Sequence, residues 1–477
     1  MASHAICICL AACLAPWMVS ASAPSPGSPG PSLFEGADKP TSPAAVPPSQ
    51  DPFYLVPEGI DKMPPGTLLK HRKPPSPIAI FLEPAESFVK DSHQIHYRTT
   101  DQQGNPTATV ATVLVPPNAD HAKVLSFQVA ADSPFGDCAP SFGFQRASSD
   151  YPMLYSENTQ LQVLLVQSAL NRGWVVVVPD ADGHKGAWPS VKLASYAVLD
   201  GIRAAKGSAP FTGIRDNATI ALWGYSWGGV TTLGALALQP SYAPELKIAG
   251  AALGGGGSDL NNVASAFNST LLRNKTSHAG FLPVWLLGLS AQLDNIKEMV
   301  DKHLRPEFRQ HFYLARHQCL EANGRTFRDE DIEAMFDDPS LLRNVSREFK
   351  VPRLDYAVPK VPVFWYQWAH DQGSETVSRA VAEYCSKGAT IEYAVETAEN
   401  LTHSTHGLTA APGALRWLGG IMDGRVPASG CSNTTVLFQG LDAGFLSIFS
   451  KHLRRRIQQF LSKSPALYDR SEISQRV

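Results

Sequence analysis

The sequence predicts an α/β fold, a largely parallel sheet covered by helices. Short β-branched runs that end at turn signals alternate with helical patterns, and this alternation is typical of an α/β sheet. Several runs are apolar on both faces, as expected for parallel strands buried beneath helices. The runs span 108–115, 124–129, 174–178, 219–223, 248–253, 361–366 and 390–395, and the helical patterns between them span 159–171, 190–205 and 374–387.

Length and charge restrict the class of protein. The chain has 477 residues, of which 44% are hydrophobic and 18% charged. This length allows several average domains, or one large core with an insertion. Lys and Arg number 41 against 43 Asp and Glu, for a net charge of −2. A balance so close to neutral argues against a nucleic-acid partner and against global disorder. We expect a folded, soluble protein.

The amino terminus predicts export. Residues 5–19 form an apolar run too short to span a bilayer, and Ala21-Ser22-Ala23 follows it as a small-x-small cleavage pattern. We interpret 1–23 as a signal peptide rather than a buried helix, and 24–50, rich in Pro, Ser, Gly and Ala, as a disordered linker or propeptide. Six glycosylation sequons support a secreted, extracellular glycoprotein. They begin at Asn217, Asn268, Asn274, Asn344, Asn400 and Asn433.

Cysteine usage agrees with an oxidising compartment. Removal of the signal peptide leaves four cysteines, an even number that such a compartment would pair. They are Cys138, Cys319, Cys385 and Cys431.

The strand–helix alternation stops between 258 and 353. This region carries helical patterns at 282–293, 296–304, 309–322 and 329–336 without a convincing strand. We therefore predict a core at 51–257 and 354–462, a helical cap at 258–353 and a carboxyl-terminal tail at 463–477. The segment 281–289 is apolar enough to line a pocket or to face lipid, or it packs as ordinary core.

The strongest local motif is Gly224-Tyr-Ser226-Trp-Gly228. It follows the predicted strand at 219–223 and precedes a small-residue helical pattern at 230–238. Gly-x-Ser-x-Gly in this context is a nucleophile elbow, a strained turn that exposes the serine hydroxyl above a helix amino terminus. We predict Ser226 as a nucleophile.

A serine nucleophile needs a base and a carboxylate that orients the base, and on this fold they follow the serine in the order acid, then histidine. Asp371 comes directly after the predicted strand at 361–366, as the acid should. Its competitors fall within or at the edge of the helical insertion. They are Asp337, Asp338 and Asp355.

Two histidines, His403 and His406, follow the strand at 390–395. We predict His403 as the base because it lies nearer the strand, with His406 as the alternative. Their His-x-x-His spacing could mark a metal pair, but no Cys or carboxylate cluster accompanies it, so we expect no metal and no cofactor.

An oxyanion hole takes two backbone N–H groups, one from the residue after the nucleophile, Trp227, and one from a loop after an early strand. Residues 130–134 follow such a strand. Asp180-Ala-Asp182-Gly-His184 also follows a strand and is interpreted as a polar loop, because it lacks the later Glu of a calcium loop. The basic stretch 451–456 is interpreted as a solvated helical face, with binding to an anionic surface as the alternative.

From about Phe53 to Gln459 the chain resembles the secretory lipases of fungi and related bacteria, the lipase A type. The resemblance extends to the closing stretch 403–417 and to Cys431. It is carried by Gln128-Val-Ala-Ala-Asp132-Ser, Asp137-Cys138-Ala-Pro-Ser141, Val177-Val-Pro-Asp180, Gly224-Tyr-Ser-Trp-Gly-Gly229 and Glu383-Tyr-Cys385-x-x-Gly-Ala389.

This resemblance implies an α/β-hydrolase fold with a helical cap. It also implies Ser226, Asp371 and His403 as nucleophile, acid and base, although in some members the base falls at the position of Asn400. Asp132 and Trp227 would supply the oxyanion N–H groups. The implied disulfides are Cys138–Cys319 and Cys385–Cys431.

The expected function is a secreted, monomeric serine lipase that hydrolyses triacylglycerol and other carboxylic esters, with a lipid–water interface as its possible site of action. The alternatives are a short-chain carboxylesterase or acyltransferase, and a serine peptidase of the same fold. Against a peptidase, residues 51–200 lack the blade repeat of a preceding β-domain. A non-catalytic lipid carrier would not need the three predicted catalytic residues.

Overall fold

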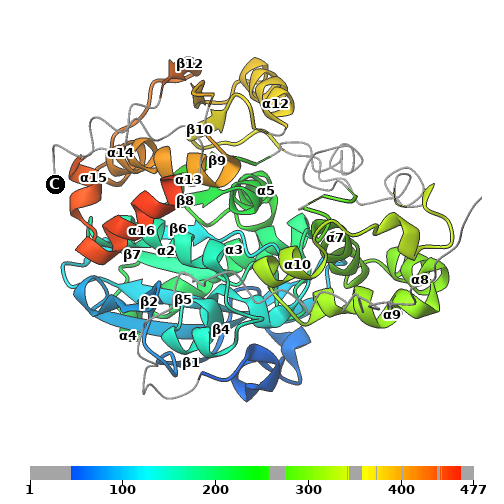
Figure 1. Ribbon diagram of the computed structural model, residues 1–477. Coiled ribbons are helices and arrows are strands. Elements are labelled where there is room, and N and C mark those ends of the chain that lie inside the picture. The colour runs from blue at the N-terminus through cyan, green and yellow to red at the C-terminus, as the bar shows by residue number, and fades with distance from the viewer. Residues whose placement is uncertain are drawn as a thin grey trace, which may run out of the picture. The chain divides into compact units, whose positions relative to one another are not determined.

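A ten-stranded sheet organises the chain in the computed structural model, which describes residues 45–256, 274–276, 278–340, 342, 357–371, 373–399, 401–437, 441 and 443–462 (Figure 1). The described residues belong to one compact unit, 41–477. In spatial order the strands are β1 (Leu68–Arg72), β4 (Asp91–Thr100), β5 (Pro106–Val115), β7 (Trp174–Pro179), β6 (Asp120–Gln128), β8 (Thr219–Tyr225), β9 (Ile248–Gly254), β10 (Val363–Trp368), β11 (Ile391–Glu396) and β12 (Cys431–Val436).

All seven predicted runs form strands of this sheet. From β7 across to β12 every neighbouring pair is parallel. The exception to the expected direction is β5, which pairs antiparallel with both β4 and β7. The short turn that connects β4 to β5 accounts for the first of these pairings, since parallel neighbours need a crossover of a dozen or more residues.

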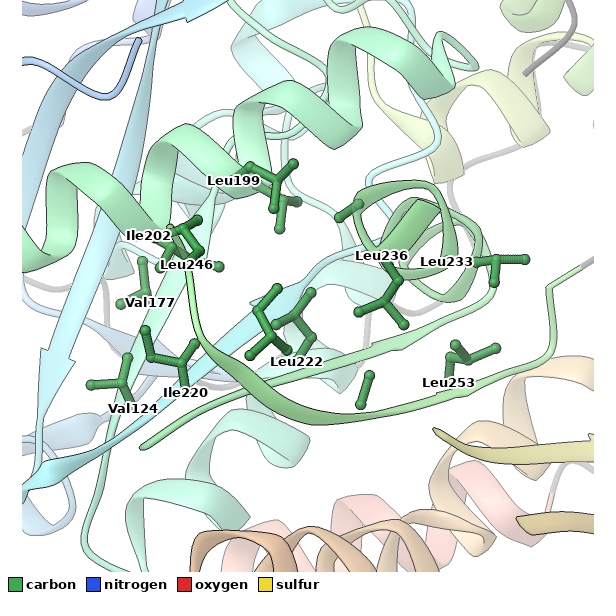
Figure 2. Close-up of a cluster of buried hydrophobic side chains, with 14 of the residues drawn as sticks. Val124, Val177, Leu199, Ile202, Ile220, Leu222, Leu233, Leu236, Leu246 and Leu253 are labelled. Carbon is green, nitrogen blue, oxygen red and sulfur yellow. The ribbon is translucent and has the colours of Figure 1, made fainter. Parts of the chain in front are cut away.

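Helices cover both faces of the sheet. On one face lie α3 (Val191–Gly207), α5 (Trp227–Tyr242) and α12 (Ser374–Ser386), whose side chains join one core cluster with the strands. Figure 2 shows part of that cluster, where leucines of α3 and α5 lie over Val177, Ile220 and Leu222.

The opposite face is covered by α2 (Glu157–Leu170) and α14 (Ala411–Met422), which contact one another. Successive side chains of β10 point to opposite faces of the sheet. Trp365 contacts Tyr384 of α12, and Phe364 stacks on Trp417 of α14.

The packed chain begins earlier than the predicted boundary at 51. Ala45 is fully buried, and Pro48–Gln50 forms a 3-10 turn. The Ser49 hydroxyl donates to Asp137 Oδ2 at 2.7 Å, which holds this turn to the loop after β6. Residues 45–50 therefore belong to the folded body and not to a disordered linker. The signal peptide, the rest of the linker and the tail at 463–477 lie outside the described residues.

The helical segment, residues 281–336, contains α7 (Phe281–Ser290), α8 (Asp294–His303), α9 (Pro306–Phe312) and α10 (Leu320–Thr326). Its apolar helix α7 is ordinary core, since nine of its ten residues are buried and six of these belong to the hydrophobic cluster of the segment itself. The predicted segment 296–304 corresponds to α8, whereas 309–322 and 329–336 are longer than the helices observed. The 309–322 pattern is broken between α9 and α10, and 329–336 holds only a 3-10 turn at Glu333–Met335.

Both disulfides implied by the resemblance are present. Cys138–Cys319, with Cα atoms 5.6 Å apart, joins the loop after β6 to the residue before α10. Cys385–Cys431, with Cα atoms 5.9 Å apart, joins α12 to β12. At the break in the helical segment, Cys319 is bonded to Cys138 in the loop after β6, and its N–H donates to the Met153 carbonyl at 2.8 Å.

The remaining elements are short or peripheral. In α16 the basic residues lie outward and Leu453 and Ile457 are buried, as expected for a solvated helical face. No helix among the described residues is long and apolar enough to cross a membrane. The other elements are α1 (Pro140–Gly143), α4 (Ala209–Thr212), α13 (His403–Thr409), α15 (Ala443–Ser447), α16 (Lys451–Ser462), β2 (Ala79–Ile80), β3 (Glu83–Pro84) and 3-10 turns at Pro52–Tyr54, Ile60–Lys62, Ala85–Ser87, Gly136–Cys138, Arg146–Asp150 and Tyr313–Arg316.

The predicted sequons differ in their surroundings. Asn217 and Asn433 are exposed. Asn274 is half-buried, and its amide donates to Asp331 at 2.6 Å and accepts from the Ile332 N–H at 2.7 Å. Asn274 is therefore engaged in holding a turn of the helical segment. Asn268, Asn344 and Asn400 lie outside the described residues.

Candidate active site

Ser226 occupies a sharp turn between β8 and α5. Its φ of +58° lies in the left-handed region that disfavours a side chain, and its N–H donates to the Gly254 carbonyl at 2.9 Å. Glycine is required on both sides, because a Cβ on Gly224 would lie 2.1 Å from the Gly228 oxygen and one on Gly228 would lie 2.0 Å from the Gln128 oxygen. The motif thus folds into the elbow that the sequence predicts.

The fold brings Ser226, His403 and Asp371 together from three distant parts of the chain. His403 Nε2 lies 2.7 Å from Ser226 Oγ, and His403 Nδ1 lies 2.8 Å and 3.0 Å from the two carboxylate oxygens of Asp371. Asp371 comes three residues after β10, and His403 is the first residue of α13. Such a line of hydrogen bonds from carboxylate through imidazole to hydroxyl can increase the nucleophilicity of the serine oxygen.

The alternative residues lie elsewhere. His406 is 1% exposed, and its Nδ1 faces the Tyr225 hydroxyl at 3.2 Å. Burial lowers the pKa of His406 to about 3, so the ring is neutral at ordinary pH. Asp337 pairs with His303 in the helical segment. Asp338 caps the Ser340 N–H. Asp355 lies outside the described residues.

Local interactions fix the histidine. The Thr402 and Thr405 side chains form a reciprocal capping box at the start of α13. The Tyr225 hydroxyl donates to the His403 carbonyl at 2.6 Å, so the residue beside the nucleophile also anchors the base. This role of Tyr225 could not be predicted from the sequence, because the position is variable within Gly-x-Ser-x-Gly and its partner is a main-chain atom.

Burial and the neighbouring carboxylates act in opposite directions on the pKa of the base. Burial lowers the pKa of His403, but the hydrogen bond and charge of Asp371, helped by the charge of Asp132, raise it further, so the net shift is upward. An imidazolium formed at His403 is therefore stabilised by two carboxylates, only one of which it hydrogen-bonds among the contacts described.

The loop that follows β6 comes to the same site. Asp132 has a φ of +48°, a second left-handed residue that is not glycine, and its side chain interacts with the charge of His403. Trp227 is the first residue of α5, so its N–H is one of the amino-terminal groups that an α-helix leaves without an internal partner. Both residues predicted to donate to an oxyanion thus border the elbow.

Asp182, beside Trp227, interacts electrostatically with two further carboxyl groups, those of Asp132 and Asp180. The Trp227 indole donates to Asp182 Oδ1 at 2.7 Å. Burial raises the pKa of Asp132 to about 6, that of Asp180 to about 7 and that of Asp182 to about 8. From the sequence, Asp180 and Asp182 were predicted to lie in a polar loop, and Asp180 also in a motif of the family resemblance. The pattern did not indicate that Asp180 is buried and Asp182 half-buried. No cluster of three or more metal-binding side chains occurs among the described residues.

From the raised pKa values of Asp180 and Asp182 we predict that the protein is less stable in alkali. Their folded-state pKa values lie above the ordinary 3.8, so the folded protein retains protons that the unfolded chain has released. Their stabilisation is complete below about pH 4 and is lost as the pH rises through 7 to 8. We expect urea denaturation to give a lower free energy of unfolding at pH 9 than at pH 7, and a smaller difference in Asp182→Asn. An unchanged difference in that variant would contradict the assignment.

The sheet, the elbow and the chain order Ser226, Asp371, His403 are those of an α/β-hydrolase. The sequence profile of the secretory lipase family matches residues 150–430. The chain belongs to the secretory lipase family and is a lipase, that is, a carboxylic ester hydrolase.

Named relatives cover nearly the whole chain. Lipase A of Arthroderma benhamiae is 36% identical over 441 residues, which are 90% of this chain and 91% of that protein. Lipase 2 of Candida albicans is 34% identical over 418 residues, which are 82% and 84% of the two chains. The crystal structure of Candida antarctica lipase A is similar with a TM-score of 0.72 and 27% identity, covering 87% of this chain and 96% of that one.

Proposed function

We propose that this protein is a secreted serine lipase that hydrolyses triacylglycerol and other carboxylic esters through an acyl-enzyme intermediate. The observation that carries the proposal is the continuous contact from Asp371 through His403 to Ser226, with 2.7 Å between His403 Nε2 and Ser226 Oγ. Membership of the secretory lipase family supports the ester substrate and the secretion.

In this proposal Ser226 Oγ attacks the ester carbonyl carbon, while His403 Nε2 accepts the hydroxyl proton. Asp371 accepts the Nδ1–H bond throughout and stabilises the imidazolium without taking its proton. The tetrahedral intermediate collapses, the C–O bond to the alcohol breaks, and His403 gives its proton to the departing oxygen. Water then attacks the acyl-enzyme with His403 again as base, which releases the carboxylic acid and restores Ser226.

We assign the oxyanion contacts to the main-chain N–H groups of Asp132 and Trp227. Negative charge that develops on the carbonyl oxygen is stabilised by N–H donors held in place before the reaction begins. The amino terminus of α5 adds a partial positive charge beneath the same position. The left-handed φ of Asp132 supports this role, because it turns the backbone of the loop at this residue.

The test compares the wild type with Ser226→Ala on emulsified long-chain triacylglycerol, a soluble short-chain ester and a proline anilide. We expect turnover of both esters by the wild type, none of the anilide, and loss of ester turnover in the variant. Activity confined to the short ester would replace the lipase proposal with a carboxylesterase. Ester turnover that persists in Ser226→Ala would overturn the proposed nucleophile.

A further inference from the structure

We propose that Gln162, a buried side chain of α2, is a positioning residue for the oxyanion loop, residues 129–133. The inference rests on the proposed function, because that function assigns one oxyanion N–H to Asp132 of this loop. Gln162 is 7% exposed and belongs to neither the elbow nor the loop it contacts.

Gln162 holds both main-chain groups of one loop residue. Its Oε1 accepts the Ala130 N–H at 2.8 Å, and its Nε2 donates to the Ala130 carbonyl at 3.1 Å. Asn158, one turn earlier on α2, donates its side-chain amide to the same carbonyl at 2.8 Å. Ala130 is 2% exposed, so water cannot readily replace these partners.

The loop needs such support because its conformation is strained. Asp132, two residues after Ala130, is held at a φ of +48°, and a residue other than glycine persists there only when its surroundings determine it. Other contacts act on the same loop: Ala130 packs in a cluster with Trp227, and the Ser133 hydroxyl lies 3.0 Å from Cys138 Sγ. Of these, only the Gln162 contacts hydrogen-bond both the N–H and the carbonyl of Ala130, two residues before Asp132.

The helix that carries Gln162, α2, is itself firmly held and can therefore fix the position of the oxyanion loop. α2 has 14 residues, of which 11 are buried, and its amino terminus is capped by Ser156. It packs against β7 in the centre of the sheet. Two hydrogen bonds from such a helix hold the loop in a fixed position. This restraint matters because an oxyanion donor tolerates little displacement.

Gln160 of the same helix offers a matched control. It is 3% exposed, and its side chain also holds two main-chain groups, accepting from the Phe81 N–H and donating to the Gly143 carbonyl, each at 2.7 Å. Neither partner belongs to the oxyanion loop. Replacement of either glutamine by leucine removes one amide acceptor and one amide donor from buried partners, so the two losses of stability should be similar.

The experiment measures kcat and KM on a soluble short-chain ester, the affinity for an arylboronic acid that forms a tetrahedral adduct with serine, and the melting temperature. We expect Gln162→Leu to lower kcat about 10- to 100-fold and to weaken boronic acid binding in parallel, with KM changed less than about threefold. Gln160→Leu should lower the melting temperature comparably and leave kcat within about threefold of the wild type.

Gln162→Glu tests the donor separately. A protonated glutamic acid can accept from the Ala130 N–H and donate to its carbonyl, whereas the carboxylate can only accept. The kcat of this variant, taken relative to the wild type at each pH, should therefore rise as the pH is lowered.

Three outcomes would overturn the inference. The first is a Gln162→Leu variant with reduced melting temperature but wild-type kcat, and the second is an equal loss of kcat in both leucine variants. The third is ester turnover retained in Ser226→Ala, assayed in parallel. In that case the proposed function itself fails and the positioning role fails with it, whereas the first two outcomes overturn the positioning role alone.

Discussion

Replacement of His403 by alanine is expected to lower kcat for ester hydrolysis by about 10⁴-fold, whereas His406→Gln should stay within about tenfold of the wild type. His403 contacts both Ser226 and Asp371, so its removal leaves the serine hydroxyl without a base and the leaving alcohol without an acid. His406 faces the Tyr225 hydroxyl from the core, and its replacement changes packing without touching the serine.

The measurement is the initial rate on a soluble ester, which avoids the lipid interface, together with titration of Ser226 by a fluorophosphonate probe. Slow labelling in His403→Ala with normal labelling in His406→Gln would agree with the assignment. Added imidazole should recover part of the lost rate in His403→Ala, because it can occupy the space of the missing ring. The reverse ranking of the two variants would show that His406, the alternative left open by the sequence, is the base.

The parts of the site that could be predicted are those whose positions follow from chain order. A serine between two glycines after a strand, an aspartate after a later strand and a histidine after the next one form a pattern along the sequence. Tyr225 and Gln162 could not be found this way, because each acts on a main-chain atom of a residue distant in sequence. Such contacts exist only once the chain has folded.

The fold shows the same division. Strands apolar on both faces were predicted, whereas β4, with buried histidines and glutamine, and β12, exposed along its whole length, were not. A strand at the edge of the sheet needs few apolar residues, and the polar residues at buried positions of β4 hide the usual periodicity. The helical segment was predicted as helical, but the break before α10 falls at Cys319, whose long-range disulfide spacing alone does not reveal.

Removal of the Cys138–Cys319 disulfide is expected to destabilise the protein more than removal of Cys385–Cys431. The first pair is separated by 181 residues and the second by 46. In the chain-entropy model these closures correspond to about 5 and roughly 4 kcal/mol, because the longer loop restricts the unfolded chain more. The two loops do not overlap in sequence, so the effects of the two removals should add.

Native contacts act in the same direction as the entropy. Next to the first disulfide, Glu321 of α10 accepts the Asn158 N–H at 2.7 Å at the start of α2, and the Cys319 N–H donates to Met153. The second disulfide fastens β12, whose residues are all exposed. Urea denaturation of the wild type and of the two double serine variants, without reductant, measures both effects. If Cys385→Ser/Cys431→Ser proves the less stable variant, loop length does not determine the contribution, and the native interactions around β12 must supply more stability than its exposure implies.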